Sequence, residues 1–205
     1  MYIAVAGNIG SGKTTLTTLL SKHMGFEPQY EDPGNNPYLL DFYSDMQRWS
    51  FNVQIYFLTS RLQSIHSIQK SKKNVIQDRT LYEDAKIFAP NLHSMGLLSK
   101  RDFDNYNALF EAISRLVPPP DLLIYLRGSI PALVDQIQQR GREYEDSIRL
   151  DYLRRLNERY EAWFESYNLG PKIEVSIDDL NFKENPEHLG VIVNNVKGEL
   201  FGLFK

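Results

Sequence analysis

Residues 7–14, with the sequence Gly-Asn-Ile-Gly-Ser-Gly-Lys-Thr, constrain this chain more than any other segment. They match the pattern G-x-x-x-x-G-K-[ST], follow the apolar residues 2–6 and precede a helical pattern over 13–23. A strand, a glycine-rich loop and a helix in this order form a phosphate-binding P-loop, because backbone N–H groups and the positive helix end face the anion. The sequence therefore predicts an α/β fold that binds a nucleoside triphosphate.

The rest of the chain alternates short apolar segments with helical patterns. The predicted strands cover residues 2–6, 26–30, 74–77, 122–126 and 173–177. The predicted helices cover residues 13–23, 50–70, 81–89, 100–116, 130–139, 151–167 and 186–204. This alternation predicts a five-stranded parallel sheet with helices on both faces. We expect one domain over residues 1–205, because no linker long enough to divide the chain is present.

Charge and composition restrict the partners of the chain. Lys and Arg total 23 against 26 Asp and Glu, so the net charge of -3 provides no broad cationic field, and we expect no nucleic-acid partner. The absence of Cys excludes disulfides and suits a reducing compartment such as the cytoplasm. No apolar run approaches the ~20 residues of a membrane span, so no membrane association is expected.

The P-loop assigns donor-binding roles to consecutive residues. Those expected to contact the triphosphate are Gly7, Asn8, Ile9, Gly10, Ser11, Gly12, Lys13, Thr14 and Thr15. Lys13 is expected to reach the β and γ oxygens of ATP, and the hydroxyl of Thr14 to bind Mg²⁺. Asp78 ends a predicted strand beside the P-loop strand, where a carboxylate can meet the same Mg²⁺ directly or through water. A P-loop alone does not separate kinases from nucleotide switches, although no N-K-x-D sequence for guanine is present.

Several further motifs together resemble the deoxyribonucleoside kinase family over roughly residues 1–165. They are the P-loop, Glu31 after the second predicted strand, Arg-Trp-Ser-Phe at 48–51 leading to Gln54 and Arg61, Asp-Arg-Thr at 78–80, and Arg-Gly-Arg-Glu-Tyr-Glu at 140–145. The segment 31–39 is similar to that of bacterial deoxyadenosine and deoxyguanosine kinases. The resemblance implies a P-loop kinase fold and ATP-dependent phosphorylation of a deoxynucleoside 5′-hydroxyl.

Glu31 is the predicted general base. It follows a strand at the carboxyl edge of the sheet, where α/β proteins bind ligands, and its carboxylate can accept the proton of the 5′-hydroxyl. Asp32 is the alternative, because the family places its Glu directly before a Pro-containing turn and this chain inserts Asp32 before Pro33. Arg79 is expected to clamp either a phosphate or Glu31.

Recognition of the nucleobase of the acceptor is assigned to Gln54, Arg61 and Asp84. Gln54 and Arg61 lie seven residues apart on one predicted helix, which gives a shared face and an axial separation of ~10.5 Å. The amide of Gln54 can pair with adenine or with the equivalent edge of cytosine, but an amide flip would also accommodate thymine. Without the resemblance, a solvated helix face is the preferred interpretation of Gln54 and Arg61. The resemblance implies that Arg61 and Asp84 select adenine, guanine or cytosine deoxynucleosides.

The resemblance also implies contacts to the sugar, the base and the donor. Tyr43 matches the aromatic residue beneath the deoxyribose, Glu145 matches a contact to the 3′-hydroxyl, and Phe88 is expected to stack on the base. Arg140 and Arg142 lie in a charged segment, about 140–149, that suits a lid closing on the triphosphate. Family members are homodimers, so a homodimer is expected here.

Two other functions remain as alternatives at this point. A nucleoside monophosphate kinase of the thymidylate type shares the P-loop and the lid, but Glu31 near the 5′ position would repel an acceptor phosphate. A P-loop nucleotide switch is the alternative outside metabolism. The sequence therefore favours a deoxynucleoside kinase.

Overall fold

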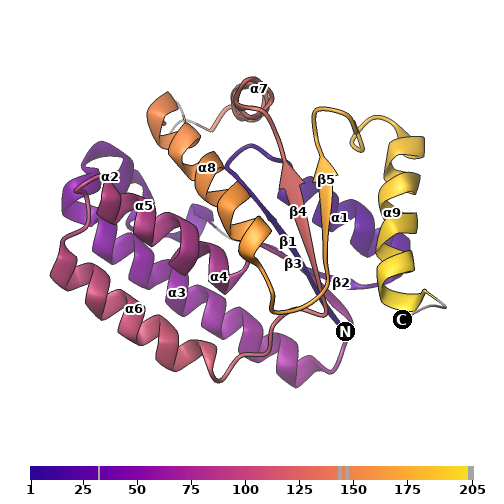
Figure 1. Cartoon of the computed structure of the whole chain (residues 1–205), viewed down its shortest axis with the longest axis horizontal. Helices are drawn as coiled ribbons and strands as arrows, with labels where there is room; N and C mark the ends of the chain where they lie inside the picture. The colour runs from indigo at the N-terminus through magenta and orange to yellow at the C-terminus, as the bar shows by residue number, and fades with distance from the viewer. Residues whose placement is uncertain (32, 143–144, 146–147, 203–205) are drawn as a thin grey trace.

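The sheet that carries the candidate site has five parallel strands in the order β2-β3-β1-β4-β5 (Figure 1). The strands are β1 (Tyr2–Gly7), β2 (Glu27–Gln29), β3 (Val75–Asp78), β4 (Leu122–Arg127) and β5 (Lys172–Ser176). This computed structural model describes residues 1–31, 33–142, 145 and 148–202. The predicted five-stranded parallel sheet is confirmed, and each predicted strand overlaps the observed one.

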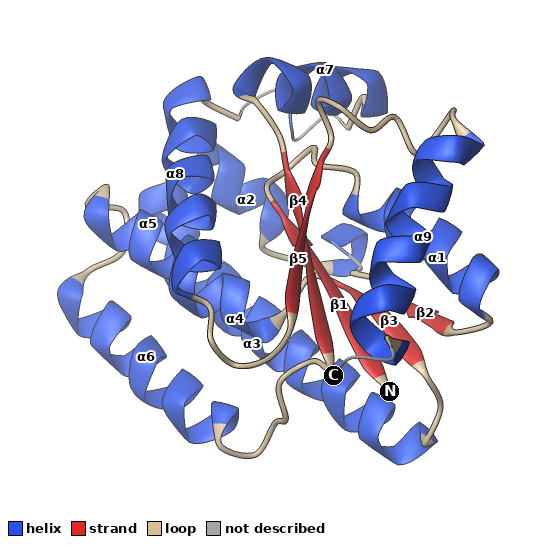
Figure 2. Ribbon diagram, turned by 45° about the vertical axis from the view of Figure 1, so that its right-hand side comes forward, coloured by secondary structure: helices blue, strands red, loops and turns tan. Residues whose placement is uncertain are grey.

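The helices occupy both sides of the sheet (Figure 2). They are α1 (Lys13–Met24), α2 (Leu39–Ser44), α3 (Met46–Ser71), α4 (Leu81–Glu83), α5 (Ala89–Ser94), α6 (Lys100–Ser114), α7 (Ile130–Arg140), α8 (Leu150–Ser166) and α9 (Pro186–Phe201). A 3₁₀ turn, η1 (Pro33–Asn35), and a π-helical segment, η2 (Asp84–Phe88), complete the described elements. The sequence patterns did not predict α2 or η1.

Alternating side chains on β1 determine which helices cover each face. Ile3 and Val5 belong to the core that includes Leu16 of α1 and Val193 of α9. Ala4 and Ala6 lie on the other face, beside aromatic residues at the end of α8. The strand is buried on both faces, as expected for the central strand of a parallel sheet.

Two helical segments differ from the sequence prediction for local reasons. Helix α3 begins at Met46 rather than at residue 50, because the side chain of Asp45 accepts a hydrogen bond from the N–H of Arg48 and caps the helix. The helix predicted over 81–89 consists of α4, η2 and α5. Pro90 lies in the first turn of α5 and has no N–H to donate, so a regular α-helical hydrogen-bond ladder cannot run through it.

The strand order places two motifs side by side at the carboxyl edge of the sheet. β1 pairs with β3 so that Val5 lies opposite Asp78. Gly7 ends β1 and begins the P-loop, so the loop and the end of β3 are neighbours. The residues predicted to bind phosphate and the residues that follow Asp78 are therefore brought together by sheet pairing.

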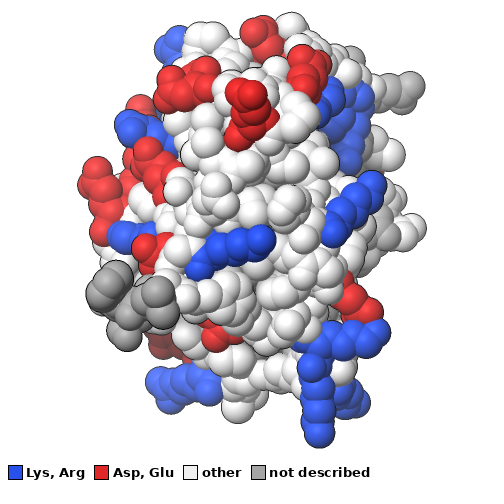
Figure 3. Space-filling model, turned by 90° about the vertical axis from the view of Figure 1, so that its right-hand side faces the viewer, with Lys and Arg blue, Asp and Glu red and all other residues white. Residues whose placement is uncertain are grey.

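The surface over α9 shows scattered charges of both signs, separated by uncharged residues (Figure 3). The described residues on this face form no continuous cationic patch of the kind that binds a nucleic-acid backbone. Among the described residues, no helix combines the length and the apolar character that crossing a membrane requires.

Candidate active site

A cavity of about 420 Å³ opens at the carboxyl edge of the sheet. The predicted site residues that line it are Ile9, Gly10, Gly12, Lys13, Thr14, Thr15, Glu31, Tyr43, Gln54, Asp78, Arg79, Asp84, Phe88, Arg140, Arg142 and Glu145. Gly7, Asn8, Ser11 and Arg61 are not part of its wall. One cavity thus brings most of the predicted donor-binding and acceptor-binding residues together.

Lys13 is held inside the P-loop. Its Nζ donates to the carbonyl oxygens of Gly7 and Asn8, each at 2.9 Å. Burial of the ammonium lowers the pKa of Lys13 to about 8, and the charge of Arg79 acts in the same direction. The loop approaches α7 so closely that a Cβ on Gly10 would lie 2.5 Å from the carbonyl oxygen of Leu133. Since Gly10 also has a φ of 83°, glycine is required there.

Thr14 and Asp78 form the pair expected to bind Mg²⁺. The hydroxyl of Thr14 donates to Oδ2 of Asp78 at 2.5 Å, and the other carboxylate oxygen, Oδ1, is buried and has no hydrogen-bond partner in the described part of the chain. Hard oxygen donors of this kind suit Mg²⁺, which usually takes one or two carboxylates and completes its shell with phosphate oxygens and water. No group of three or more His, Cys, Asp or Glu that could hold a metal occurs in the described part of the chain. The pair therefore fits an ion bound together with a triphosphate.

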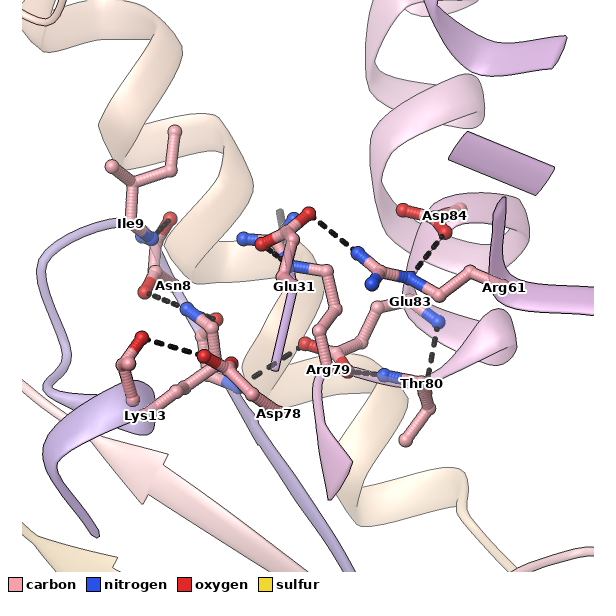
Figure 4. Close-up of polar contacts among 12 residues, drawn as sticks. Asn8, Ile9, Lys13, Glu31, Arg61, Asp78, Arg79, Thr80, Glu83 and Asp84 are labelled. Carbon is pink, nitrogen blue, oxygen red and sulfur yellow. Dashed lines mark hydrogen bonds and ion pairs between the residues drawn. The ribbon is translucent and has the colours of Figure 1, made fainter. Parts of the chain in front are cut away.

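Glu31 lies between two arginines (Figure 4). Its Oε1 accepts from Nη2 of Arg61 at 2.5 Å, and its Oε2 lies 3.3 Å from Nε of Arg79. Burial alone would raise the pKa of Glu31, but the positive charges of Arg79 and Arg61 outweigh it and bring the pKa to about 2. Glu31 is therefore ionised at neutral pH. Asp32, the alternative base, lies outside the described residues.

The spacing of Gln54 and Arg61 predicted that both side chains face the acceptor base, but only Gln54 lines the cavity. Gln54 lines the cavity, and its Oε1 is buried with no hydrogen-bond partner among the described residues. Arg61 lies behind the wall and joins Glu31 to Asp84, with Nε donating to Oδ2 of Asp84 at 3.3 Å. Burial raises the pKa of Asp84 to about 6, against the lowering effect of Arg61. The geometry thus makes Arg61 a link between Glu31 and the base wall.

Arg79 has an unusual backbone conformation. Its φ of 69° lies in the left-handed region, which non-glycine residues rarely adopt. The N–H of Arg79 donates to the carbonyl oxygen of Val5 at 2.9 Å. The guanidinium lies 4.5 Å from the centre of the Phe88 ring, within the range of a cation–π contact. This conformation directs Arg79 toward Glu31 and the cavity.

The acceptor side of the cavity includes aromatic rings. Tyr43 packs edge-on against Phe42, with ring centres 5.2 Å apart, and both residues line the cavity. Phe88 belongs to η2, one helical segment that also carries Asp84. These rings provide an apolar surface of the size that a base and a sugar require.

The two predicted lid arginines converge on Glu145. Nε of Arg140 donates to Oε2 of Glu145 at 2.9 Å, and Nη1 of Arg142 lies 3.6 Å from Oε1. The side chain of Glu145 is 4% exposed. Residues 143–144 and 146–147 of the predicted lid lie outside the described residues.

Several functional candidates were missed by the sequence analysis. Gln136, Gln139 and Lys183 also line the cavity, and no motif marks them. Glu83 forms a capping box with Thr80, and its side chain also accepts from the N–H of Gly7. The spacing Thr-x-x-Glu is a known helix-start signal and could have identified Glu83 as structured. Its contact to the P-loop depends on the tertiary fold.

The chain is similar to known deoxynucleoside kinases over most of its length. The family model for deoxynucleoside kinase matches residues 3–200. A deoxyadenosine/deoxycytidine kinase of Bacillus subtilis is 39% identical over 196 residues, covering 95% of this chain and 90% of that protein. A deoxyguanosine kinase of Lactobacillus johnsonii is 35% identical over 207 residues, covering 97% and 92%.

A solved structure gives the same result in three dimensions. A deoxyadenosine kinase from M. mycoides, with the products dCMP and a flexible dCDP bound, superimposes with a TM-score of 0.87 at 30% identity. The superposition covers 97% of this chain and 100% of that one. Each similarity spans nearly the whole chain and is not confined to the P-loop.

The pH dependence of stability tests the environment of Glu31. Its pKa is about 2 in the folded chain against an ordinary 4.5, so its ionised form stabilises the fold fully above pH 4.5, and this contribution is lost as the pH falls toward 2. Glu31→Gln is therefore expected to lower the free energy of unfolding by on the order of 3 kcal/mol at neutral pH. The difference from the wild type should shrink as the pH falls from about 5 to about 3. Urea unfolding across this range measures it.

Glu27→Gln is the matched control, because Glu27 pairs with Lys73 on the surface with both side chains more than half exposed. An exposed ion pair contributes less than ~1 kcal/mol, so this variant should stay close to the wild type at every pH. If Glu31→Gln lowers the free energy of unfolding by the same amount at neutral and at acid pH, the result would contradict the lowered pKa of Glu31.

Proposed function

The chain belongs to the deoxynucleoside kinase family, and from this premise we propose that it transfers the γ-phosphoryl group of ATP to the 5′-hydroxyl of a deoxynucleoside in nucleotide salvage. The predicted P-loop kinase fold is the fold of the similar deoxyadenosine kinase structures. The relatives include deoxyadenosine/deoxycytidine, deoxyadenosine and deoxyguanosine kinases. Deoxyadenosine and deoxyguanosine are therefore the favoured acceptors, with deoxycytidine as a further one.

The observation that carries this proposal is the placement of an ionised Glu31 in the same cavity as Lys13. Phosphoryl transfer proceeds through a loose transition state, so the acceptor hydroxyl needs positioning more than it needs a strong base. A carboxylate with a pKa of about 2 accepts the hydrogen bond of the 5′-hydroxyl and takes its proton late in the reaction. Arg61 and Arg79 keep this carboxylate charged and fix its orientation.

The donor half of the reaction uses the P-loop. Lys13 stabilises the charge that develops on the transferring group, and the lid arginines Arg140 and Arg142 add positive charge from the other side of the cavity. Thr14 and Asp78 would hold Mg²⁺. When bound, the ion neutralises charge on the β and γ oxygens of the donor.

The acceptor half uses the opposite wall. The amide oxygen of Gln54, Oε1, has no hydrogen-bond partner among the described residues, so the amide can read the polar edge of a base. Phe88 and Tyr43 offer rings for the base and the sugar, and Glu145 is the proposed contact for the 3′-hydroxyl. A ring close to C2′ leaves little room for a ribose hydroxyl, which favours deoxyribose.

We also infer a cytoplasmic homodimer. The inference on location rests on the absence of Cys, and that on assembly rests on the family. An exposed apolar side chain on α6, Leu109, with 41% of its surface accessible, suits a face that a second copy covers.

A panel of acceptors tests the proposed function. The release of ADP from ATP is measured with each deoxynucleoside and with each deoxynucleoside monophosphate. We expect turnover with the nucleosides, and Lys13→Ala should lower kcat by ~10² or more because its ammonium acts on the transferring group. Turnover with monophosphates alone would favour a thymidylate-type kinase, and slow hydrolysis with neither would favour a nucleotide switch.

The role of Glu31 is tested by kinetics at neutral pH, below the melting temperature of the variant. Glu31→Gln keeps the shape of the side chain but removes the basic oxygen, so kcat should fall by ~10² or more while the nucleoside KM changes less. Asp32→Asn is the comparison and should leave kcat near the wild-type value. A large loss in Asp32→Asn with an active Glu31→Gln would move the base to Asp32.

Base selection is tested with all four deoxynucleosides at one ATP concentration. A site built to hydrogen-bond a polar base edge can reject an unmatched base by up to ~10⁴-fold, so thymidine should be the poorest acceptor. The double variant Arg61→Met with Asp84→Ala removes the Asp84 carboxylate from the cavity wall and its Arg61 partner from behind the wall, and it should narrow the difference in kcat/KM between thymidine and the other acceptors. Its kcat should also fall, because Arg61 no longer orients Glu31.

A matched control for that double variant is Arg127→Met with Glu161→Ala, an exposed pair outside the cavity wall. It should leave the ranking of the four acceptors unchanged. Thymidine as the best acceptor of the wild type would overturn the base-site proposal and leave the kinase activity standing.

A further inference from the structure

Glu83 is a completely buried carboxylate that contacts three separate segments of the chain. Its Oε1 accepts from the N–H of Gly7 at 3.2 Å and from the hydroxyl of Tyr160 at 2.9 Å. Its Oε2 accepts from the N–H of Thr80 at 2.6 Å (Figure 4). These donors belong to the P-loop, to the turn after β3 and to α8. Neither Glu83 nor Tyr160 lines the cavity.

Each backbone group held by Glu83 adjoins a residue of the reaction. Gly7 donates its N–H to Glu83 and accepts with its carbonyl from Nζ of Lys13, so Glu83 and Lys13 fix two sides of one residue. Thr80 follows Arg79, whose left-handed conformation must be maintained by its surroundings. One carboxylate therefore anchors both the P-loop and the Arg79 turn.

A helix cap alone does not account for this arrangement. The capping box requires only the reciprocal bonds between Thr80 and Glu83, and α4 is three residues long. Within the described residues Glu83 forms no direct ion pair, although its charge acts on Lys13 and Arg79. Burying a carboxylate without a direct ionic partner costs several kcal/mol unless hydrogen bonds satisfy it. The bonds from Gly7 and Tyr160 supply that compensation, and a surface cap would need neither.

Helix α8 also holds the P-loop at a second point. Nδ2 of Asn8 donates to the carbonyl oxygen of Leu153 and to Oδ1 of Asn157, each at 3.1 Å. Asn157 and Tyr160 lie three residues apart and thus on one face of α8. This face aligns the P-loop directly through Asn8 and indirectly through Glu83.

We propose that Glu83 is a positioning residue for phosphoryl transfer, which holds Gly7 and Thr80 so that Lys13 and Arg79 act on the same phosphoryl group, and that Tyr160 orients its carboxylate. This inference rests on the proposed kinase function. It predicts an effect on kcat and on ATP binding, because Lys13 and Arg79 are displaced. It predicts little effect on deoxynucleoside binding, because the carboxylate of Glu83 bonds to Gly7, Thr80 and Tyr160, whereas Gln54 lies on the acceptor wall.

The test compares Glu83→Gln and Tyr160→Phe with Tyr125→Phe as the matched control. Tyr125 is also buried and stacks on Tyr160 with ring centres 6.0 Å apart, but its hydroxyl has no hydrogen-bond partner among the described residues. We expect kcat to fall by ~10-fold or more in Glu83→Gln and by about 3-fold to 10-fold in Tyr160→Phe, with the deoxynucleoside Kd within about twofold of the wild type. Tyr125→Phe should change kcat and the deoxynucleoside Kd by less than about twofold.

Two further measurements distinguish a positioning role of Glu83 from a general loss of fold stability in the variants. The ATP Kd, measured by calorimetry without turnover, should weaken in Glu83→Gln and Tyr160→Phe and not in the control. Because both residues act through one carboxylate, the double variant should lose little more kcat than Glu83→Gln alone. Thermal melting confirms that each variant is folded at the assay temperature, and Tyr160→Phe provides the test if Glu83→Gln does not fold.

The proposal would be overturned if Tyr160→Phe had the same kcat and the same ATP Kd as Tyr125→Phe. It would also be overturned if the Glu83 and Tyr160 variants lost affinity for the deoxynucleoside alone. A wild-type chain without turnover on any deoxynucleoside would instead overturn the proposed function. In that case the ATP Kd values still decide whether Glu83 positions the P-loop.

Discussion

The sharing of one partly buried carboxylate between two arginines organises the site. Glu31 arrives from the segment after β2, Arg61 from α3 and Arg79 from the end of β3, so three distant segments meet at one charge. Removing ions of both signs from water costs several kcal/mol per ion, and the mutual attraction repays this only when each charge is well paired. Arg61 is therefore also bonded to Asp84, and Arg79 lies against the Phe88 ring. The acceptor wall and the phosphate site are coupled through these shared charges.

Sheet topology determines why those charges lie beside the P-loop. β1 is flanked by β3 and β4, and the parallel pairing brings the carboxyl ends of all three strands to one edge. Asp78 consequently reaches Thr14, and the turn that follows Asp78 lies within reach of Gly7. The alternation of large and small residues on β1 lets helices approach from both faces without disturbing this edge. The chemistry is thus assembled from strand ends, which are the most rigid positions in such a fold.

Local sequence patterns predicted the features that depend on local structure. The P-loop, the five strands and the presence of most helices follow from residue spacing, and Asp78 follows from the neighbouring strands. The position of Arg61 does not. Residues seven apart on a helix differ in direction by only ~20°, and the carboxylates of Glu31 and Asp84 decide that Arg61 turns away from the cavity while Gln54 faces it. The cavity contact of Lys183 likewise comes from a loop with no motif.

The segment between Thr80 and Pro90 contacts both the proposed base wall and the proposed phosphate site. Its first turn is anchored by Glu83, which also holds the P-loop, and its end is limited by Pro90, which cannot continue the hydrogen-bond ladder. Between these two constraints the backbone takes the π-helical form, which is often found at functional sites, and places Asp84 and Phe88 one turn apart on the cavity wall. Because Asp84 also binds Arg61, the same segment contacts the network that holds Glu31. The base wall therefore has a support of its own in the Arg61–Asp84 bond, which does not involve Glu83.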